Sequence, residues 1–177
     1  MEAKRVTSIR FGTPAYCHGD AKMIKLDRIL CPTDLSDFSK HALRYGCEFA
    51  NRFDAELHLL NVVQDVVALV PEPGMAFPAP GDYMQDLQQA SQEAIDQLPD
   101  PDWLREIPVV REVRVGTPFL EIVRYAKEAD IDMIVLGTHG RAGLAHVLLG
   151  STAEKVVRKA HCPVLTVRPE GHQFVMP

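Results

Sequence analysis

Short apolar segments alternate with amphipathic segments along most of this chain. Apolar runs occupy residues 29–31, 57–63, 132–136 and 163–167, and a partly alternating run occupies 109–115; each has the length and composition of a strand. Between them lie stretches of helical composition at 36–51, 83–98, 118–128 and 150–160. The resulting order β-α-β-α-β-α-β-α-β predicts a parallel sheet with helices on both faces and right-handed crossovers.

Finer features of this pattern predict how single elements are used. Phe38, Ala42, Tyr45 and Phe49 recur at helical spacing, which predicts that they form the buried face of the first helix. The run 109–115 alternates towards its end, as strands near a sheet edge do. The Pro- and Gly-rich stretch 70–81 predicts a loop without regular structure, either a lid or a surface excursion.

Two apolar runs end in residues suited to ligand binding. We expect an open five-stranded sheet of order 3-2-1-4-5, in which ligands bind beyond the carboxyl ends of strands 1 and 4, where the winding direction reverses. The first strand ends at Pro32-Thr33-Asp34 and the fourth at Gly137. The topology therefore predicts one site between these two strand ends.

Glycines and hydroxyl residues surround the end of the fourth strand. Gly137-Thr138-His139-Gly140 follows it directly, and Gly150-Ser151-Thr152 begins the next helix. Glycine at 137 permits a positive φ and a close ligand approach. The first N–H groups of a helix lack partners within the helix, so they attract anions. The pattern predicts a phosphate site; the alternative is that Ser151 is only an N-cap and Glu154 completes a capping box.

The ends of the first and second strands suit a nucleoside. A carboxylate at Asp34 repels phosphates but accepts hydrogen bonds from ribose hydroxyls or an adenine amine, so we assign it to the nucleoside end. Its alternative role is that of a turn residue before Ser36. Val62, at the end of the second strand, suits packing against a base. His58 and Asn61 are the polar residues inside that strand, and His58 is expected to be a hydrogen-bonded core residue.

Composition narrows the class of protein. The chain has 177 residues, 46% of them hydrophobic, which suits one globular domain spanning residues 27–169, with an N-terminal extension at 1–26 and a C-terminal tail at 170–177. A net charge of −5 argues against general nucleic-acid binding. The four cysteines have neither disulfide nor zinc spacing. Because the chain also lacks a secretory signal and a membrane-spanning run, we expect a cytoplasmic protein that does not bind membranes.

Three motifs resemble the pattern of the universal stress protein family in both their order and their spacing. They are Cys31-Pro32-Thr33-Asp34-Leu35-Ser36, the glycine pattern from Gly137 to Thr152, and Cys162-Pro163-Val164-Leu165-Thr166-Val167. The resemblance covers about residues 27–169. It implies a Rossmann-like fold of the adenine nucleotide alpha hydrolase type. The complete G-x2-G-x9-G-(S/T) pattern resembles the ATP-binding branch of the family.

The resemblance also implies ligands and partners. It implies that ATP or AMP is the ligand, with Mg²⁺ accompanying ATP. The contacts it implies are Pro32, Thr33, Asp34 and Val62 for the nucleoside, and Gly137, Gly140, Gly150, Ser151, Thr152 and the backbone of Ala153 for the phosphates, with Leu136 adjacent to the ligand. Family members commonly form homodimers through the last strand, which places the interface at 163–168.

Three functions remain as hypotheses. The leading one is a stress-response protein that couples ATP or AMP occupancy to dimer or loop conformation, and so to an unidentified regulatory partner. The second is a slow ATPase or nucleotidyl transferase using His139, Arg141 or His146, although the phosphate-binding lysine of G-x4-G-K-(S/T) is absent. The third is a dimeric scaffold that binds no nucleotide.

Overall fold

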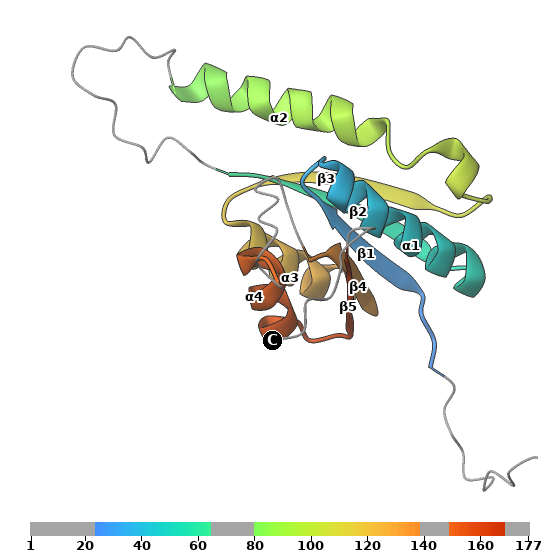
Figure 1. Ribbon diagram of the computed structural model, residues 1–177. Coiled ribbons are helices and arrows are strands. Elements are labelled where there is room, and N and C mark those ends of the chain that lie inside the picture. Colours follow the sequence, from blue (N-terminus) through green and yellow to red (C-terminus); the bar gives the residue numbers. More distant parts are fainter. Residues whose placement is uncertain (1–23, 65–79, 139–148, 169–177) are drawn as a thin grey trace, which may run out of the picture.

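A computed structural model describes residues 24–64, 80–138 and 149–168 (Figure 1). Within these ranges the chain forms, in order, β1 (Arg28–Thr33), α1 (Asp37–Phe53), β2 (Glu56–Val63), α2 (Pro80–Asp96), the 3-10 turn η2 (Pro101–Trp103), β3 (Val109–Val115), α3 (Pro118–Glu128), β4 (Met133–Gly137), α4 (Ser151–Lys159) and β5 (Val164–Val167). The predicted alternation of strands and helices is confirmed.

The five strands form one parallel sheet in the order β3-β2-β1-β4-β5, as the sequence predicts. β1 pairs with β2 along its whole length, ending at Thr33 opposite Asn61. In contrast, β1 pairs with β4 only at Ile29 and Leu30. Beyond this contact the two strands no longer pair with each other, so they separate towards their carboxyl ends, which is where ligands bind in open α/β sheets.

Two helical layers enclose the sheet, with α1 and α2 on one face and α3 and α4 on the other (Figure 1). Alternate residues of β1 face the two layers: Ile29 belongs to the core under α1, and Leu30 to the core under α3 and α4. Both side chains are fully buried, and burying a side chain of this size contributes about 1.5–3 kcal/mol to folding. The buried strands thus fix the sheet that positions the site.

The predicted buried face of α1 is wrong at two of its four positions, since Ala42 is buried and Phe49 packs against the core as predicted. Phe38 and Tyr45 are 38% and 46% exposed, whereas the buried positions are Ser39, Ala42, Leu43, Gly46, Cys47 and Ala50. Small residues let the helix approach the sheet closely. A Cβ on Gly46 would lie only 2.1 Å from Sγ of Cys31, so no larger residue fits there.

Two other boundaries bear on the sequence expectations. α2 begins at Pro80, so the expected loop is wrong at residues 80 and 81; proline suits the first turn of a helix, where its missing N–H is not required. Residues 70–79 lie outside the described residues. β3 is an edge strand with mostly half-buried side chains, as expected. Within the described residues, no helix is both long and apolar enough to cross a membrane.

Candidate functional site

A cavity of about 690 Å³ lies at the carboxyl edge of the sheet, within the usual range for small-molecule sites. We call it the carboxyl-edge cavity. Ten of the eleven predicted site residues line it: Pro32, Thr33, Asp34, Val62, Leu136, Gly137, Gly150, Ser151, Thr152 and Ala153. The eleventh, Gly140, lies outside the described residues. Separate segments of the sequence therefore meet at one cavity, at the place that the topology predicts.

The turn after β1 is held by its own side chains. Thr33 Oγ1 accepts a hydrogen bond from the backbone N–H of Leu35 at 3.0 Å and lies 2.9 Å from Ser39 Oγ. Leu35 has a positive φ of 67°, which brings the chain sharply round to the start of α1. These contacts hold the wall formed by Thr33 before any ligand arrives.

Asp34 takes part in this turn. Its Oδ1 accepts hydrogen bonds from the N–H of Ser36 at 3.1 Å and from Ser36 Oγ at 2.5 Å. Ser36 in turn is the N-cap of α1 and accepts from the N–H of Ser39 at 3.3 Å. The alternative role of Asp34 as a turn residue is therefore present in the structure, alongside its position on the cavity wall.

The N-terminus of α4 opens at the cavity. Gly150, not Ser151, is its N-cap, and no side chain caps the helix, so the capping-box alternative is wrong. The first bond within the helix runs from the N–H of Glu154 to the carbonyl of Gly150 at 2.9 Å. The N–H groups of Ser151, Thr152 and Ala153 therefore have no acceptor within the helix, and they carry the positive end of its dipole.

Two backbone bonds fix this helix end to the sheet. The N–H of Gly150 donates to the carbonyl of Thr138 at 2.7 Å, and the N–H of Thr138 donates to the carbonyl of Val167 at 2.9 Å. A Cβ on Gly150 would lie 3.0 Å from the Thr138 oxygen, a backbone atom that cannot move freely. Glycine at 150 therefore permits close contact between the helix end and the end of β4.

Gly137 does not adopt the positive φ that glycine permits at this position. Gly137 is the last residue of β4 and pairs with Val167, which requires an extended backbone. Among the described glycines, the positive φ belongs to Gly116, at 148°. Gly137 still lines the cavity. Its contribution there is that it has no side chain to occupy the space, not that it makes a turn.

Part of the cavity wall comes from residues that were not among the eleven predicted contacts. These are Ser39, Leu60, Asn61, Val63, Gln64, Tyr83, Leu87, Ser91, Pro118, Ile122 and Thr138. Tyr83, Leu87 and Ser91 recur every four residues along α2, so their spacing fits one helix face, but nothing in the sequence says that this face meets a ligand. Asn61 has a detectable signal, because it is a polar residue inside an apolar strand.

Among the described lining residues, Asp34 is the only one with a side chain charged at neutral pH. None of these described lining residues has a cationic side chain, so any anion bound there would depend on their backbone N–H and hydroxyl donors. Within the same part of the chain, no group of three or more His, Cys, Asp or Glu side chains is arranged to hold a metal. Burial raises the pKa of the nearby Cys31 thiol, and the adjacent Cys47 raises it further, so this thiol stays protonated and unreactive.

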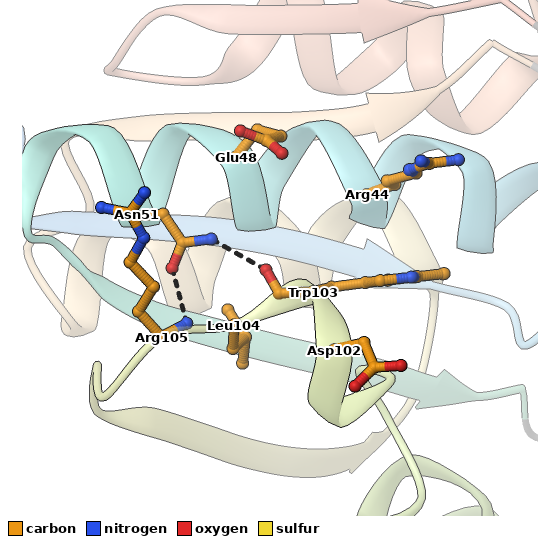
Figure 2. A pocket seen from close by; sticks show the side chains of 7 residues that line it. All are labelled: Arg44, Glu48, Asn51, Asp102, Trp103, Leu104 and Arg105. Atoms are coloured by element: carbon orange, nitrogen blue, oxygen red, sulfur yellow. Dashed lines mark hydrogen bonds between the residues drawn. The ribbon is translucent and has the colours of Figure 1, made fainter.

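A smaller hollow of about 250 Å³ lies between α1 and η2 (Figure 2), and we call it the α1–η2 hollow. It is lined by Arg44, Glu48, Asn51, Asp102, Trp103, Leu104 and Arg105. Asn51 joins its two sides: its Nδ2 donates to the carbonyl of Trp103 at 2.8 Å, and its Oδ1 accepts from the N–H of Arg105 at 2.9 Å.

Comparison with known proteins identifies the family. The profile of the family described as "Universal stress protein family" matches residues 25–168, which is most of the chain. This chain belongs to the universal stress protein family. Universal stress protein MJ0531 of Methanocaldococcus jannaschii is 38% identical over 144 residues, covering 80% of this chain and 81% of the relative.

Solved structures agree with the family and with the fold. Protein MJ0577 of the same organism is 27% identical with a TM-score of 0.67, over 84% of this chain and 99% of that one. UspA from Lactobacillus plantarum is 28% identical with a TM-score of 0.57, over 81% and 99% of the two chains. A universal stress protein solved in complex with cAMP is 25% identical with a TM-score of 0.50, over 81% and 97%.

Proposed function

We propose that this universal stress protein binds an adenine nucleotide, ATP or AMP, in the carboxyl-edge cavity. The observation that carries the proposal is the meeting of four sequence-distant strand and helix ends, those of β1, β2, β4 and α4, around one cavity. The relative solved with cAMP supports the class of ligand, because cAMP is itself an adenine nucleotide.

The two ends of the cavity suit the two ends of such a ligand. The N-terminus of α4, with the N–H groups of Ser151, Thr152 and Ala153, suits the phosphates. Pro32, Thr33, Asp34 and Val62 suit the ribose and base. Since Asp34 is a single carboxylate at the nucleoside end, Mg²⁺ accompanying ATP would take most of its ligands from the triphosphate and water.

In the cell, we propose that nucleotide occupancy changes dimer or loop conformation and thereby the binding of a regulatory partner in the cytoplasm. β5 supports a homodimer through residues 163–168, because it lies at an open edge of the sheet and its Val164 and Leu165 are only half-buried. The residues of the enzyme hypothesis, His139, Arg141 and His146, lie outside the described residues, and no observation favours that hypothesis over binding.

The test measures nucleotide directly. Purified protein is denatured and the released small molecules are identified by mass spectrometry; in parallel, the melting temperature is measured with millimolar ATP or AMP. We expect an adenine nucleotide in the released fraction or a rise in melting temperature. Gly140→Val, a change at a glycine that the family pattern assigns to the phosphates, should abolish both. Absence of both in the wild-type protein would contradict the proposal and favour the nucleotide-free scaffold.

A further inference from the structure

Asn61 is a buried polar residue in a strand that is otherwise mostly apolar. It is 3% exposed, lies opposite Thr33 at the carboxyl end of β1, and lines the carboxyl-edge cavity. A buried amide has donors at one end and an acceptor at the other, and leaving either without a partner costs about 1–3 kcal/mol. The partners of Asn61 therefore indicate whether the residue is purely structural.

The orientation of the Asn61 amide is fixed by one bond. Its Nδ2 donates to the carbonyl oxygen of Thr33 at 2.8 Å. That oxygen can only accept, so a flipped amide would bring two acceptors together. The amino end thus points to β1, and the acceptor Oδ1 is held at the opposite end. No described residue donates a hydrogen bond to this Oδ1.

The neighbouring polar groups at this end of the cavity already have partners. Asp34 Oδ1 accepts from Ser36, and Thr33 Oγ1 bonds to Leu35 and Ser39. Asn61 Oδ1 is different, because it is an oriented acceptor on the wall of the cavity with no donor among the described residues. Asn61 precedes Val62 in β2, and both residues line the cavity where the base of the proposed nucleotide would lie.

We propose that Asn61 selects adenine among the purines. Its Oδ1 accepts a hydrogen bond from the exocyclic amino group at position 6 of adenine. Hypoxanthine and guanine carry a carbonyl oxygen at that position, which would face Oδ1 as a second acceptor and leave both unpaired. This role rests on the proposed function and adds a specificity residue that the sequence motifs do not contain.

The experiment compares pairs of nucleotides that differ only at position 6. Affinities of the full-length protein for AMP and IMP, and for ATP and ITP, are measured by titration calorimetry. We expect the wild-type protein to favour the adenine member by at least about tenfold, because a site built around a hydrogen bond rejects a mismatched partner. Asn61→Leu, similar in size but without an acceptor, should reduce this preference to within about threefold.

Asn51→Leu is the matched control. It removes a half-buried asparagine that also bridges two elements, but far along α1 from the cavity, so the preference for adenine should stay at the wild-type value. Because Asn61→Leu also loses the bond to Thr33, its melting temperature will fall. A purely structural role would lower the affinity for AMP and IMP equally, whereas a selective role changes their ratio.

The outcomes separate the two proposals. Equal affinity of the wild-type protein for AMP and IMP, or an unchanged ratio in Asn61→Leu, would overturn the role of Asn61 while nucleotide binding stands. Failure of all four nucleotides to bind would overturn both. If Asn61→Leu does not fold, the wild-type protein decides alone: purine riboside 5′-monophosphate, with only hydrogen at position 6, should bind about tenfold more weakly than AMP, and equal binding would overturn the proposal.

Discussion

The carboxyl-edge cavity and the α1–η2 hollow are both lined by polar groups, but they differ in how those groups are bonded. In the hollow, the side-chain amide of Asn51 has a partner at each end, the backbone carbonyl of Trp103 and the backbone N–H of Arg105. In the cavity, Asn61 has a partner among the described residues at its amino end only, and the first N–H groups of α4 have no acceptor within their helix.

This difference follows from how each space arises. The hollow forms where a surface turn packs on a helix and Asn51 bonds the two together. Its charged side chains, at Arg44, Glu48, Asp102 and Arg105, are exposed to water. The cavity forms where β1 and β4 separate, so strand and helix ends meet a space that the described residues do not fill. Oriented polar groups without protein partners are the feature that favours a ligand site.

The largest effect is expected from Gly150→Val at the cavity. The added Cβ would lie 3.0 Å from the Thr138 carbonyl oxygen, and the branched side chain would displace the start of α4. We expect nucleotide affinity to fall at least about 100-fold, equivalent to about 3 kcal/mol, as measured by calorimetry. Val157→Ala, an exposed change on the same helix, should retain wild-type affinity. Wild-type affinity in Gly150→Val would show that the phosphates bind elsewhere.

The second effect is on stability and belongs to the hollow. Asn51→Leu removes two hydrogen bonds and leaves the Trp103 carbonyl and the Arg105 N–H without these partners. We expect a loss of about 2–3 kcal/mol in the free energy of unfolding, measured by urea denaturation, and nucleotide affinity within about twofold of wild type. A large loss of affinity would contradict the separation of the two spaces.

A third buried polar group, His58, lies outside both spaces and tests whether burial alone implies binding. Its Nδ1 lies 2.8 Å from the Tyr125 hydroxyl, and its Nε2 lies 2.8 Å from Glu56 Oε1 without the alignment of a hydrogen bond. Desolvation lowers the pKa of His58, an effect partly opposed by Glu56. We assign His58 a structural role, as its position in the core suggests.

Because the pKa of His58 is lower in the folded than in the unfolded chain, the unfolded state takes up the proton first as pH falls. The stability contribution is therefore complete above about pH 6.5, the usual histidine value, and is lost as pH falls through the lowered pKa. Denaturation curves should show a steeper decline below pH 6.5 for wild type than for His58→Gln. Nucleotide affinity should be equal in the two proteins at pH 8; a loss in the variant would contradict a structural role.

The smallest effect is expected from Arg44→Ala in the hollow. Arg44 is exposed, and removing a hydrated surface charge changes the free energy of unfolding by less than about 0.5 kcal/mol. Urea denaturation and calorimetry should both give values close to wild type. If nucleotide affinity fell with this variant, the hollow rather than the cavity would hold the ligand.

The fold could be predicted because its signals are local. Each strand is a short run that is apolar or, in β3, alternating, and the strand-helix alternation determines a parallel sheet. The cavity could be located for the same reason, since strand ends and the glycines at 137 and 150 are visible in the sequence. Both predictions depend on chain order and strand ends rather than on side-chain orientation.

The remaining features depend on packing across the structure. The aromatic spacing of Phe38 and Tyr45 suggested a buried face, but close packing of α1 against Cys31 favours the face that contains Gly46. The orientation of Asn61 depends on the Thr33 carbonyl in the neighbouring strand. The wall formed by α2 depends on where that helix docks. Sequence periodicity does not contain the tertiary contacts that decide these three features.

Hydrogen exchange with and without saturating ATP or AMP tests the central claim most directly, because it compares the two spaces in one sample. The account predicts slower exchange for backbone amides at residues 33–34, 61–62 and 151–153 on nucleotide addition, with no change at residues 44–51 and 102–105 around the α1–η2 hollow. Protection confined to the hollow, or no protection at the N-terminus of α4, would contradict nucleotide binding in the carboxyl-edge cavity.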